Sequence, residues 1–278
     1  MKFFELTRGI SPLLISIPHA GTFIPDDLRA TMTEMALETP DTDWHIPRLY
    51  DFAGAMGATM IAANYSRYVI DLNRPPDNAA LYPGQAKVSL CPDETFEGQK
   101  IYKSGGGLDE AEVARRLKTY WQPYHDELAA QIARIKNEHG YVMLYDAHSI
   151  KGVLPRLFEG RLPDLNLGTA GGKSCAPDMG DIAFKTAKNG PYSAVLNGRF
   201  IGGYITRHYG DPAHDVHALQ MELVRENYMD ESNFEFLEDR AEKLRAVLTP
   251  VLQAIIDWGA KTYSPSRTTA AQGLNPKR

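Results

Sequence analysis

The sequence predicts one α/β domain built around a largely parallel β-sheet. Short apolar runs alternate along the chain with segments whose apolar residues recur at helical spacing, which is typical of such a fold. No repeat or linker divides the chain, and 278 residues with 43% hydrophobic content suffice for a core without disulfides. We therefore expect a single domain over residues 1–263. The small, polar residues 264–278 predict a disordered tail.

The predicted strands are short apolar runs bounded by proline, glycine or polar residues. Leu13–Ile17 is the clearest example, because a proline stands on each side of it. The other runs cover residues 59–62, 68–72, 141–145, 194–196 and 218–223. The last run also fits a helix with Glu222 on its polar face, so both assignments stay open at this point.

The predicted helices carry start and stop signals in order along the chain. Acidic residues after Pro25 predict a helix start, and a second helix is expected from residues 41–43 to Met56, where Gly57 ends it. The longest pattern, residues 108–138, contains Pro123, which should kink or divide it. Two further helices are expected, at 179–188 and 234–258. Segments 74–107, 151–176 and 202–208 lack periodicity and are predicted to be loops.

Composition narrows the class of partner. The net charge is -5 and no run of lysine and arginine resembles a nucleic-acid footprint. No apolar run approaches the roughly 20 residues that span a bilayer, and Glu5 and Arg8 interrupt any signal-peptide core. Cys91 and Cys175 lack metal-binding spacing. We expect a cytoplasmic protein that acts on a small molecule, with no nucleic-acid or membrane partner; the oligomeric state is left open.

Polar groups follow four of the predicted strands, where chemistry collects in parallel sheets. They are His19, the group Asp71, Asn73 and Arg74, the pair Asp146 and His148, and the pair Gln220 and Glu222. His19 and His148 are candidate zinc ligands, and Asp41 or Asp43 is a candidate third ligand. Asp146 lies two residues from His148, so it would either orient that imidazole or bind the metal itself.

Arginines near the same strand ends predict an anionic substrate. Arg67 and Arg74 flank one predicted strand, and Arg207 follows a glycine-rich loop. A guanidinium group binds a carboxylate through two parallel hydrogen bonds, so several arginines in one cleft favour a dicarboxylate. Glu222, inside an apolar run, is a candidate general base beside a metal-bound water. No G-x-S-x-G motif supports a serine nucleophile.

Seven stretches carry a resemblance that runs in order over nearly the whole chain. They are PHAGTFIP (18–25), DTDWHIPRLYD (41–51), YSRYVIDLNRPPD (65–77), LYDAHS (144–149), GRLPDLNLGT (160–169), NGRFIGGYITRHYGDP (197–212) and HALQMEL (217–223). With them the sequence resembles the N-formylglutamate amidohydrolase (N-formylglutamate deformylase) family. The resemblance implies a zinc-carboxypeptidase-like (phosphorylase/hydrolase-like) fold: three layers, in which helices cover both faces of a mixed sheet with a parallel centre.

The resemblance also implies a metal-dependent hydrolase that cleaves N-formyl-L-glutamate to formate and L-glutamate in histidine degradation. His19 and His148 correspond to metal ligands, and Glu222 to the general base. The related carboxypeptidases have a glutamate ligand three residues after the first histidine, where this chain has Thr22. We choose Asp43 as the third ligand, with Asp41 and Asp146 as alternatives, and Zn²⁺ as the metal ion.

The resulting hypothesis gives each candidate residue a role. Arg67 helps to stabilise the oxyanion, while Arg74, Arg207 and Asn73 hold the two substrate carboxylates. Tyr204 and Thr206 close a loop over the substrate. Two alternatives remain: a related metal-dependent deacylase or carboxypeptidase for another N-acyl amino acid, and a non-catalytic carboxylate-binding protein.

Overall fold

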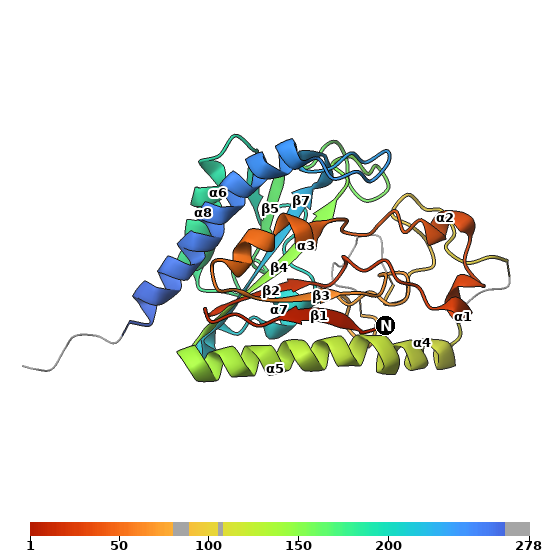
Figure 1. Ribbon diagram of the computed structural model, residues 1–278, viewed down its shortest axis with the longest axis horizontal. Coiled ribbons are helices and arrows are strands. Elements are labelled where there is room, and N and C mark those ends of the chain that lie inside the picture. Colours follow the sequence, from red (N-terminus) through yellow and green to blue (C-terminus); the bar gives the residue numbers. More distant parts are fainter. Residues whose placement is uncertain (80–88, 105–107, 265–278) are drawn as a thin grey trace, which may run out of the picture.

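The computed structural model describes residues 1–79, 89–104 and 108–264. In this part of the chain one mixed sheet has the strand order β1–β3–β2–β4–β7–β5–β6 (Figure 1). Its strands are β1 Phe4–Thr7, β2 Leu13–Ile17, β3 Thr59–Ala63, β4 Val142–Ile150, β5 Leu165–Gly168, β6 Ala194–Leu196 and β7 Val216–Val224. The four central strands, β3, β2, β4 and β7, are mutually parallel, as predicted.

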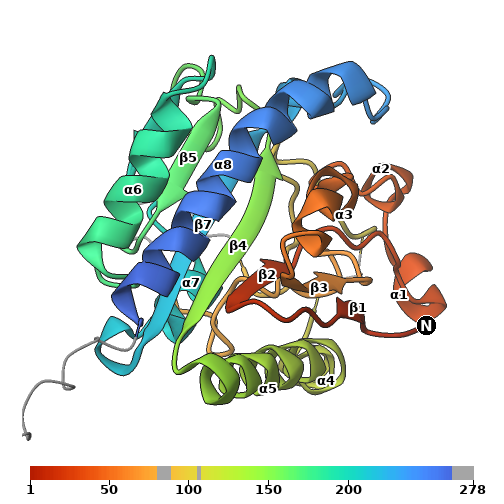
Figure 2. The ribbon, with the colours of Figure 1, turned by 60° about the vertical axis from the view of Figure 1, so that its left-hand side comes forward.

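Helices cover both faces of the sheet, so the three-layer prediction is confirmed (Figures 1 and 2). The α-helices are α1 Asp26–Arg29, α2 Glu34–Leu37, α3 Ile46–Leu49, α4 Glu110–Arg116, α5 Gln122–His139, α6 Pro177–Lys188, α7 Tyr204–Tyr209 and α8 Glu238–Thr262. Short 3₁₀ segments occupy Asp51–Gly54, Pro212–His214 and Arg225–Asn227. No helix among the described residues is both long and apolar enough to cross a membrane.

The core is divided by the sheet into two layers, because successive strand residues point to opposite faces. Leu13, Ile15 and Ile17 pack on the face that α3, α6 and α8 cover. Leu14 and Leu144 pack on the other face, toward α5 and α7. Residues Val216–Val224 form the buried strand β7, which pairs with β4 and β5, so the alternative of a helix there is wrong.

The long helix from residue 108 changes its winding just before Pro123, where a kink or division was predicted, and continues without a gap. Asp109 caps α4 by accepting a hydrogen bond from Glu112 N (2.8 Å), and Gly140 ends α5 with a φ of 85°. Between the two helices, residues Leu117–Trp121 form a π-helical turn. Pro123 has no N–H to donate to the preceding turn, and the chain widens there instead of breaking.

The predicted strand at residues 68–72 is wrong. Val69 N donates to Ser66 O (2.8 Å) and Asp71 N donates to Leu90 O (2.7 Å), so the chain turns instead of extending along the sheet. The run is apolar because Tyr68, Val69 and Ile70 are buried. This turn brings the Arg67 guanidinium to the Asp71 carboxylate (2.7 Å).

Other boundaries differ from the predictions for local reasons. The helix expected from residues 41–43 to 56 begins only at Ile46, because His45 has a φ of 61°, outside the helical region. Residues 204–209 form α7 rather than a loop, and 165–168 form the unpredicted strand β5. Of the predicted 74–107 loop, the described residues form no helix or named strand. Residues 265–278 of the predicted tail lie outside the described residues.

Candidate metal centre and cleft

Three of the predicted strand ends meet at one edge of the sheet. β2 leads through Pro18 to His19, and the register of β4 and β7 places His148 directly beside Glu222. Asp146 and His148 continue the face of β4 on which Leu144 is buried toward α5. That face of the strand is apolar in its middle and polar at its carboxyl end. The same face therefore contributes first to the hydrophobic core and then to the site.

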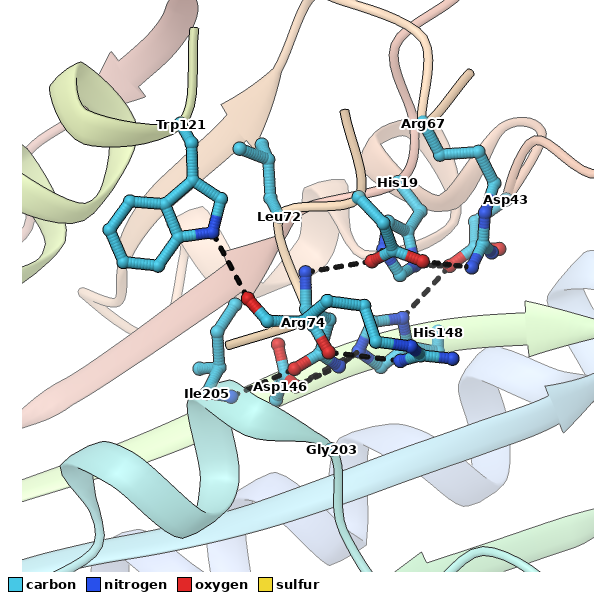
Figure 3. A network of polar contacts seen from close by, with 12 residues as sticks. His19, Asp43, Arg67, Leu72, Arg74, Trp121, Asp146, His148, Gly203 and Ile205 are labelled. Atoms are coloured by element: carbon cyan, nitrogen blue, oxygen red, sulfur yellow. Dashed lines mark hydrogen bonds and ion pairs between the residues drawn. The ribbon is translucent and has the colours of Figure 1, made fainter. Parts of the chain in front are cut away.

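His19, Asp43 and His148 form a buried cluster of potential metal ligands. Their ligand atoms all lie within 4.8 Å of one another. Asp43 Oδ2 is 3.7 Å from His19 Nδ1 and 3.0 Å from His148 Nδ1 (Figure 3). Two imidazole nitrogens and one carboxylate oxygen match the three protein ligands of a catalytic zinc site.

Each imidazole of the cluster has its own carboxylate on the opposite ring nitrogen. His19 Nε2 lies 2.7 Å from Asp71 Oδ1, and His148 Nε2 lies 2.9 Å from Asp146 Oδ2. Metal-binding histidines show this arrangement, because the carboxylate keeps the proton on one nitrogen and leaves the other for the metal. The side chains therefore fit a divalent metal ion, bound through the two Nδ1 atoms and Asp43.

The charges in the cluster are strongly coupled. Burial alone would lower the pKa of His148, but Asp146 and Asp43 outweigh it and hold that pKa well above its usual range. Burial alone would raise the pKa of Asp43, but the hydrogen bonds and charges of the two histidines lower it. The Asp43 carboxyl is thus held in the ionised form that a metal ligand requires.

Asp43, and not Thr22, stands next to the two histidines of the cluster. Thr22 is exposed and lies outside the cluster. Asp43 stands in the turn before α3, where its N–H donates to His19 O (2.9 Å) and fixes the two residues beside each other. Asp41, one of the alternatives, has its carboxylate bound elsewhere, by the Tyr68 hydroxyl (2.7 Å) and Phe96 N (2.8 Å).

Glu222 is buried next to this cluster. Its Oε2 accepts a hydrogen bond from Gln220 Nε2 (3.2 Å), as expected for two residues on one face of a strand. Burial raises the pKa of Glu222 to about 7, while the charges of His148 and Arg67 oppose the rise and that of Asp43 adds to it. A carboxyl group that titrates near neutral pH can both take up and release a proton during a reaction.

A cleft opens over the cluster, with about 660 Å³ of space between the side chains and in the open solvent at its mouth. Its polar wall includes His19, Asp43, His148 and Glu222, together with Arg67, Asn73, Arg74 and Arg199. Its apolar wall includes Phe96, Ile150, Leu157 and Phe200. The Arg67 guanidinium, paired with Asp71, lies 4.5 Å from the centre of the Phe96 ring. The cleft thus combines a floor of potential metal ligands with cationic groups and an apolar rim.

Three residues predicted to contact substrate lie on α7, outside the residues that line this cleft. The Tyr204 ring packs against Trp121 and His125, the Thr206 side chain is buried, and Arg207 Nε donates to Gly202 O (2.8 Å). The segment is a helix, and these three side chains contact the residues around it instead of lining the cleft. Conversely, Arg199 lines the cleft but was not predicted as a site residue. Nothing in the stretch NGRFIGG distinguishes it from an arginine on the surface.

The fold and the cluster together define a class: an α/β protein with a buried His–Asp–His cluster of potential metal ligands beside the carboxyl ends of parallel strands. Within it, the chain belongs to the N-formylglutamate amidohydrolase family, whose model matches residues 11–229. It is 48% identical over 264 residues to the N-formylglutamate deformylase of Pseudomonas putida, an alignment that covers 94% of this chain and 98% of the relative. The N-formylglutamate deformylase of Pseudomonas aeruginosa is 50% identical over 266 residues, or 95% and 99% of the two chains.

Solved structures agree with this assignment. The crystal structure of N-formylglutamate amidohydrolase from Ralstonia eutropha JMP134 superposes with a TM-score of 0.82 at 26% identity, over 94% of this chain and 100% of that one. A gene product from Agrobacterium tumefaciens shares the fold, with a TM-score of 0.67 at 20% identity, over 92% and 96% of the two chains.

Proposed function

We propose that this protein hydrolyses N-formyl-L-glutamate to formate and L-glutamate with the help of a divalent metal ion, best matched by Zn²⁺. The observation that carries the proposal is the register of β4 and β7, which sets Glu222 beside His148 of the ligand cluster. The choice of substrate is supported by two N-formylglutamate deformylases, which are 48% and 50% identical to this chain over nearly its full length. The proposal includes residues 1–263 as the catalytic domain of a cytoplasmic enzyme in histidine degradation.

Hydrolysis requires a water oxygen to bond to the formyl carbon, and the C–N bond to break. When bound, a metal ion held by His19, Asp43 and His148 would supply Lewis acidity to the formyl oxygen and to water. Glu222 takes a proton from the attacking water and delivers it to the leaving nitrogen, which departs as the amine of glutamate. Arg67, buried beside the cluster, stabilises the negative charge that develops on the formyl oxygen.

The two substrate carboxylates need cationic partners in the same cleft. Arg74 and Arg199 line it with Arg67, and they are partly buried, which strengthens their attraction for an anion. We assign them the α- and side-chain carboxylates of the substrate, with no order between them. Three residues of α7 do not line the cleft, so we assign them no contact with the substrate; they are Tyr204, Thr206 and Arg207.

The direct test is formate release by the purified protein. We expect N-formyl-L-glutamate to yield formate, a zinc chelator to stop the reaction, and added Zn²⁺ to restore it. Two comparison substrates test the alternatives. N-acetyl-L-glutamate tests for the related deacylase, and a short peptide with a free C-terminal carboxylate tests for the carboxypeptidase. Hydrolysis of either in place of N-formyl-L-glutamate would overturn the substrate assignment. Binding of N-formyl-L-glutamate without hydrolysis would favour the non-catalytic carboxylate-binding protein.

Removing an arginine should separate the roles of the two carboxylates. Arg74→Ala and Arg199→Ala should each raise the KM for N-formyl-L-glutamate by about 10- to 100-fold, the range for a lost hydrogen bond to a charged group. With N-formyl-L-norvaline, which lacks the side-chain carboxylate, one of the two substitutions should have little further effect. Steady-state kinetics on both substrates would identify that arginine.

Arg207→Ala serves as the comparison variant for this experiment. Because Arg207 is outside the cleft lining, its loss should change KM by less than about threefold. The opposite result would be a raised KM in Arg207→Ala, with KM values of Arg74→Ala and Arg199→Ala equal to that of the wild type. It would show that Arg207 on α7 binds a substrate carboxylate and that the two cleft arginines do not.

A further inference from the structure

Asn73 occupies the turn that joins the two histidine–carboxylate pairs. Its backbone N–H donates to Asp71 Oδ1 (2.9 Å), the same oxygen that lies 2.7 Å from His19 Nε2. Its side-chain Nδ2 donates to Asp146 Oδ2 (3.1 Å) and lies 2.9 Å from His148 Nε2, the ring nitrogen that Asp146 Oδ2 also contacts at 2.9 Å. One buried residue therefore contacts the carboxylate behind each imidazole.

The orientation of the Asn73 amide is fixed from its other side. Its Oδ1 accepts a hydrogen bond from Ile205 N (2.8 Å) at the start of α7, so its Nδ2 must face Asp146. Gly203 closes the space around it, because a Cβ at Gly203 would lie 2.3 Å from Asn73 Nδ2. Both polar atoms of the amide thus have partners inside the protein.

The turn itself is held by the helix on its far side. His125 Nε2 donates to Leu72 O (2.8 Å), and Trp121 Nε1 donates to Arg74 O (3.1 Å). The two rings stack with their centroids 3.7 Å apart. Burial lowers the pKa of His125 to about 3, so this imidazole stays neutral and keeps one N–H for Leu72. The backbone on both sides of Asn73 is therefore anchored independently of any ligand.

We propose that Asn73 is a positioning residue of the metal centre, which couples Asp71 and Asp146 and so aims both imidazoles, rather than a ligand of the substrate carboxylate. The inference rests on the metal centre of the proposed function. Asn73 Nδ2 and Asp146 Oδ2 both contact His148 Nε2, so together they fix the imidazole with its Nδ1 toward Asp43. The backbone contact to Asp71 does the same for His19.

The test compares Asn73→Asp and Asn73→Ala with Arg74→Ala, a substitution at the next residue in the cleft. Asn73→Asp keeps the shape and the acceptor for Ile205 N, but loses the Nδ2 group that donates to Asp146 and contacts His148 Nε2. Competition with a chromophoric chelator should show Zn²⁺ bound about 10- to 100-fold more weakly by both Asn73 variants, a typical cost of losing such a partner. At saturating Zn²⁺ their KM should remain within about twofold of the wild-type value. Arg74→Ala should show the reverse: unchanged Zn²⁺ affinity and a raised KM.

Several results would overturn this inference. Unchanged Zn²⁺ affinity with a raised KM would make Asn73 a substrate ligand, and a lower melting temperature alone would make it a purely structural residue. Either result would leave the proposed function standing. A wild-type protein that binds no Zn²⁺ would remove the metal centre itself and the inference with it. If Asn73→Ala fails to fold, the isosteric Asn73→Asp still decides between these outcomes.

Discussion

Replacing Glu222 by glutamine is expected to lower kcat for formate release by about 10³-fold, within the range for loss of a general base. Glutamine keeps the size of the side chain and can still pair with Gln220, but it cannot take up a proton. Zn²⁺ content and substrate affinity should remain close to those of the wild type. Single-turnover kinetics and elemental analysis of the purified variant would measure the two effects separately.

The matched control is Glu231→Gln. Glu231 is only partly buried, but burial raises its pKa as it does that of Glu222, and it does not line the cleft. Its substitution should change kcat by less than about twofold. Loss of zinc from Glu222→Gln would show that Glu222 is a metal ligand, and equal losses of activity in the two variants would argue against a specific role in proton transfer.

Loss of the metal is the second large effect that we expect, and it should follow Asp43 rather than Asp41. Asp43→Ala removes the carboxylate between the two imidazoles and should reduce bound Zn²⁺ to a small fraction of one ion per chain, with activity lost in proportion. Asp41→Asn should retain the metal, because its carboxylate is bound by Tyr68 and Phe96. Metal analysis after dialysis against trace chelator measures both.

The alternative ligand Asp146 can be separated by the same assay. Asp146→Asn should weaken the affinity for Zn²⁺ without abolishing it, since this side chain bonds to the imidazole nitrogen that faces away from the cluster. A variant at Asp41 or Asp146 that loses the metal completely, beside an Asp43 variant that retains it, would reverse our choice of third ligand.

Much of the sheet and the centre of the site could be predicted from the sequence. Parallel strands place their carboxyl ends together, so histidines after two apolar runs were expected to meet, and His19 and His148 do. The period of two along a strand likewise placed Asp146 with His148. These predictions depend on local patterns and on one general rule of sheet geometry.

The parts that could not be predicted depend on contacts between distant residues. Residues 68–72 have the apolar composition of a strand, but Leu90 and α4 provide their burial and hydrogen bonds. Helix α7 starts where Ile205 N finds Asn73, 132 positions earlier in the chain. Arg199 likewise lines the cleft because of the path that the chain takes after β6. The residues next to Arg199 in the sequence do not indicate that path.

The π-helical turn between α4 and α5 has a consequence for how this site can vary between related proteins. Arg116 Nη1 donates to Val69 O (3.1 Å), and His125 and Trp121 bind the carbonyls of Leu72 and Arg74. Side chains from α4, the π-helical turn and α5 thus replace the neighbouring strand that this segment lacks. The π-helical turn sets the rotational phase between those side chains, and a one-residue deletion there would rotate one half of the helix by about 100° relative to the other. Insertions and deletions near Trp121 should therefore be as disruptive to this site as changes in the cleft itself.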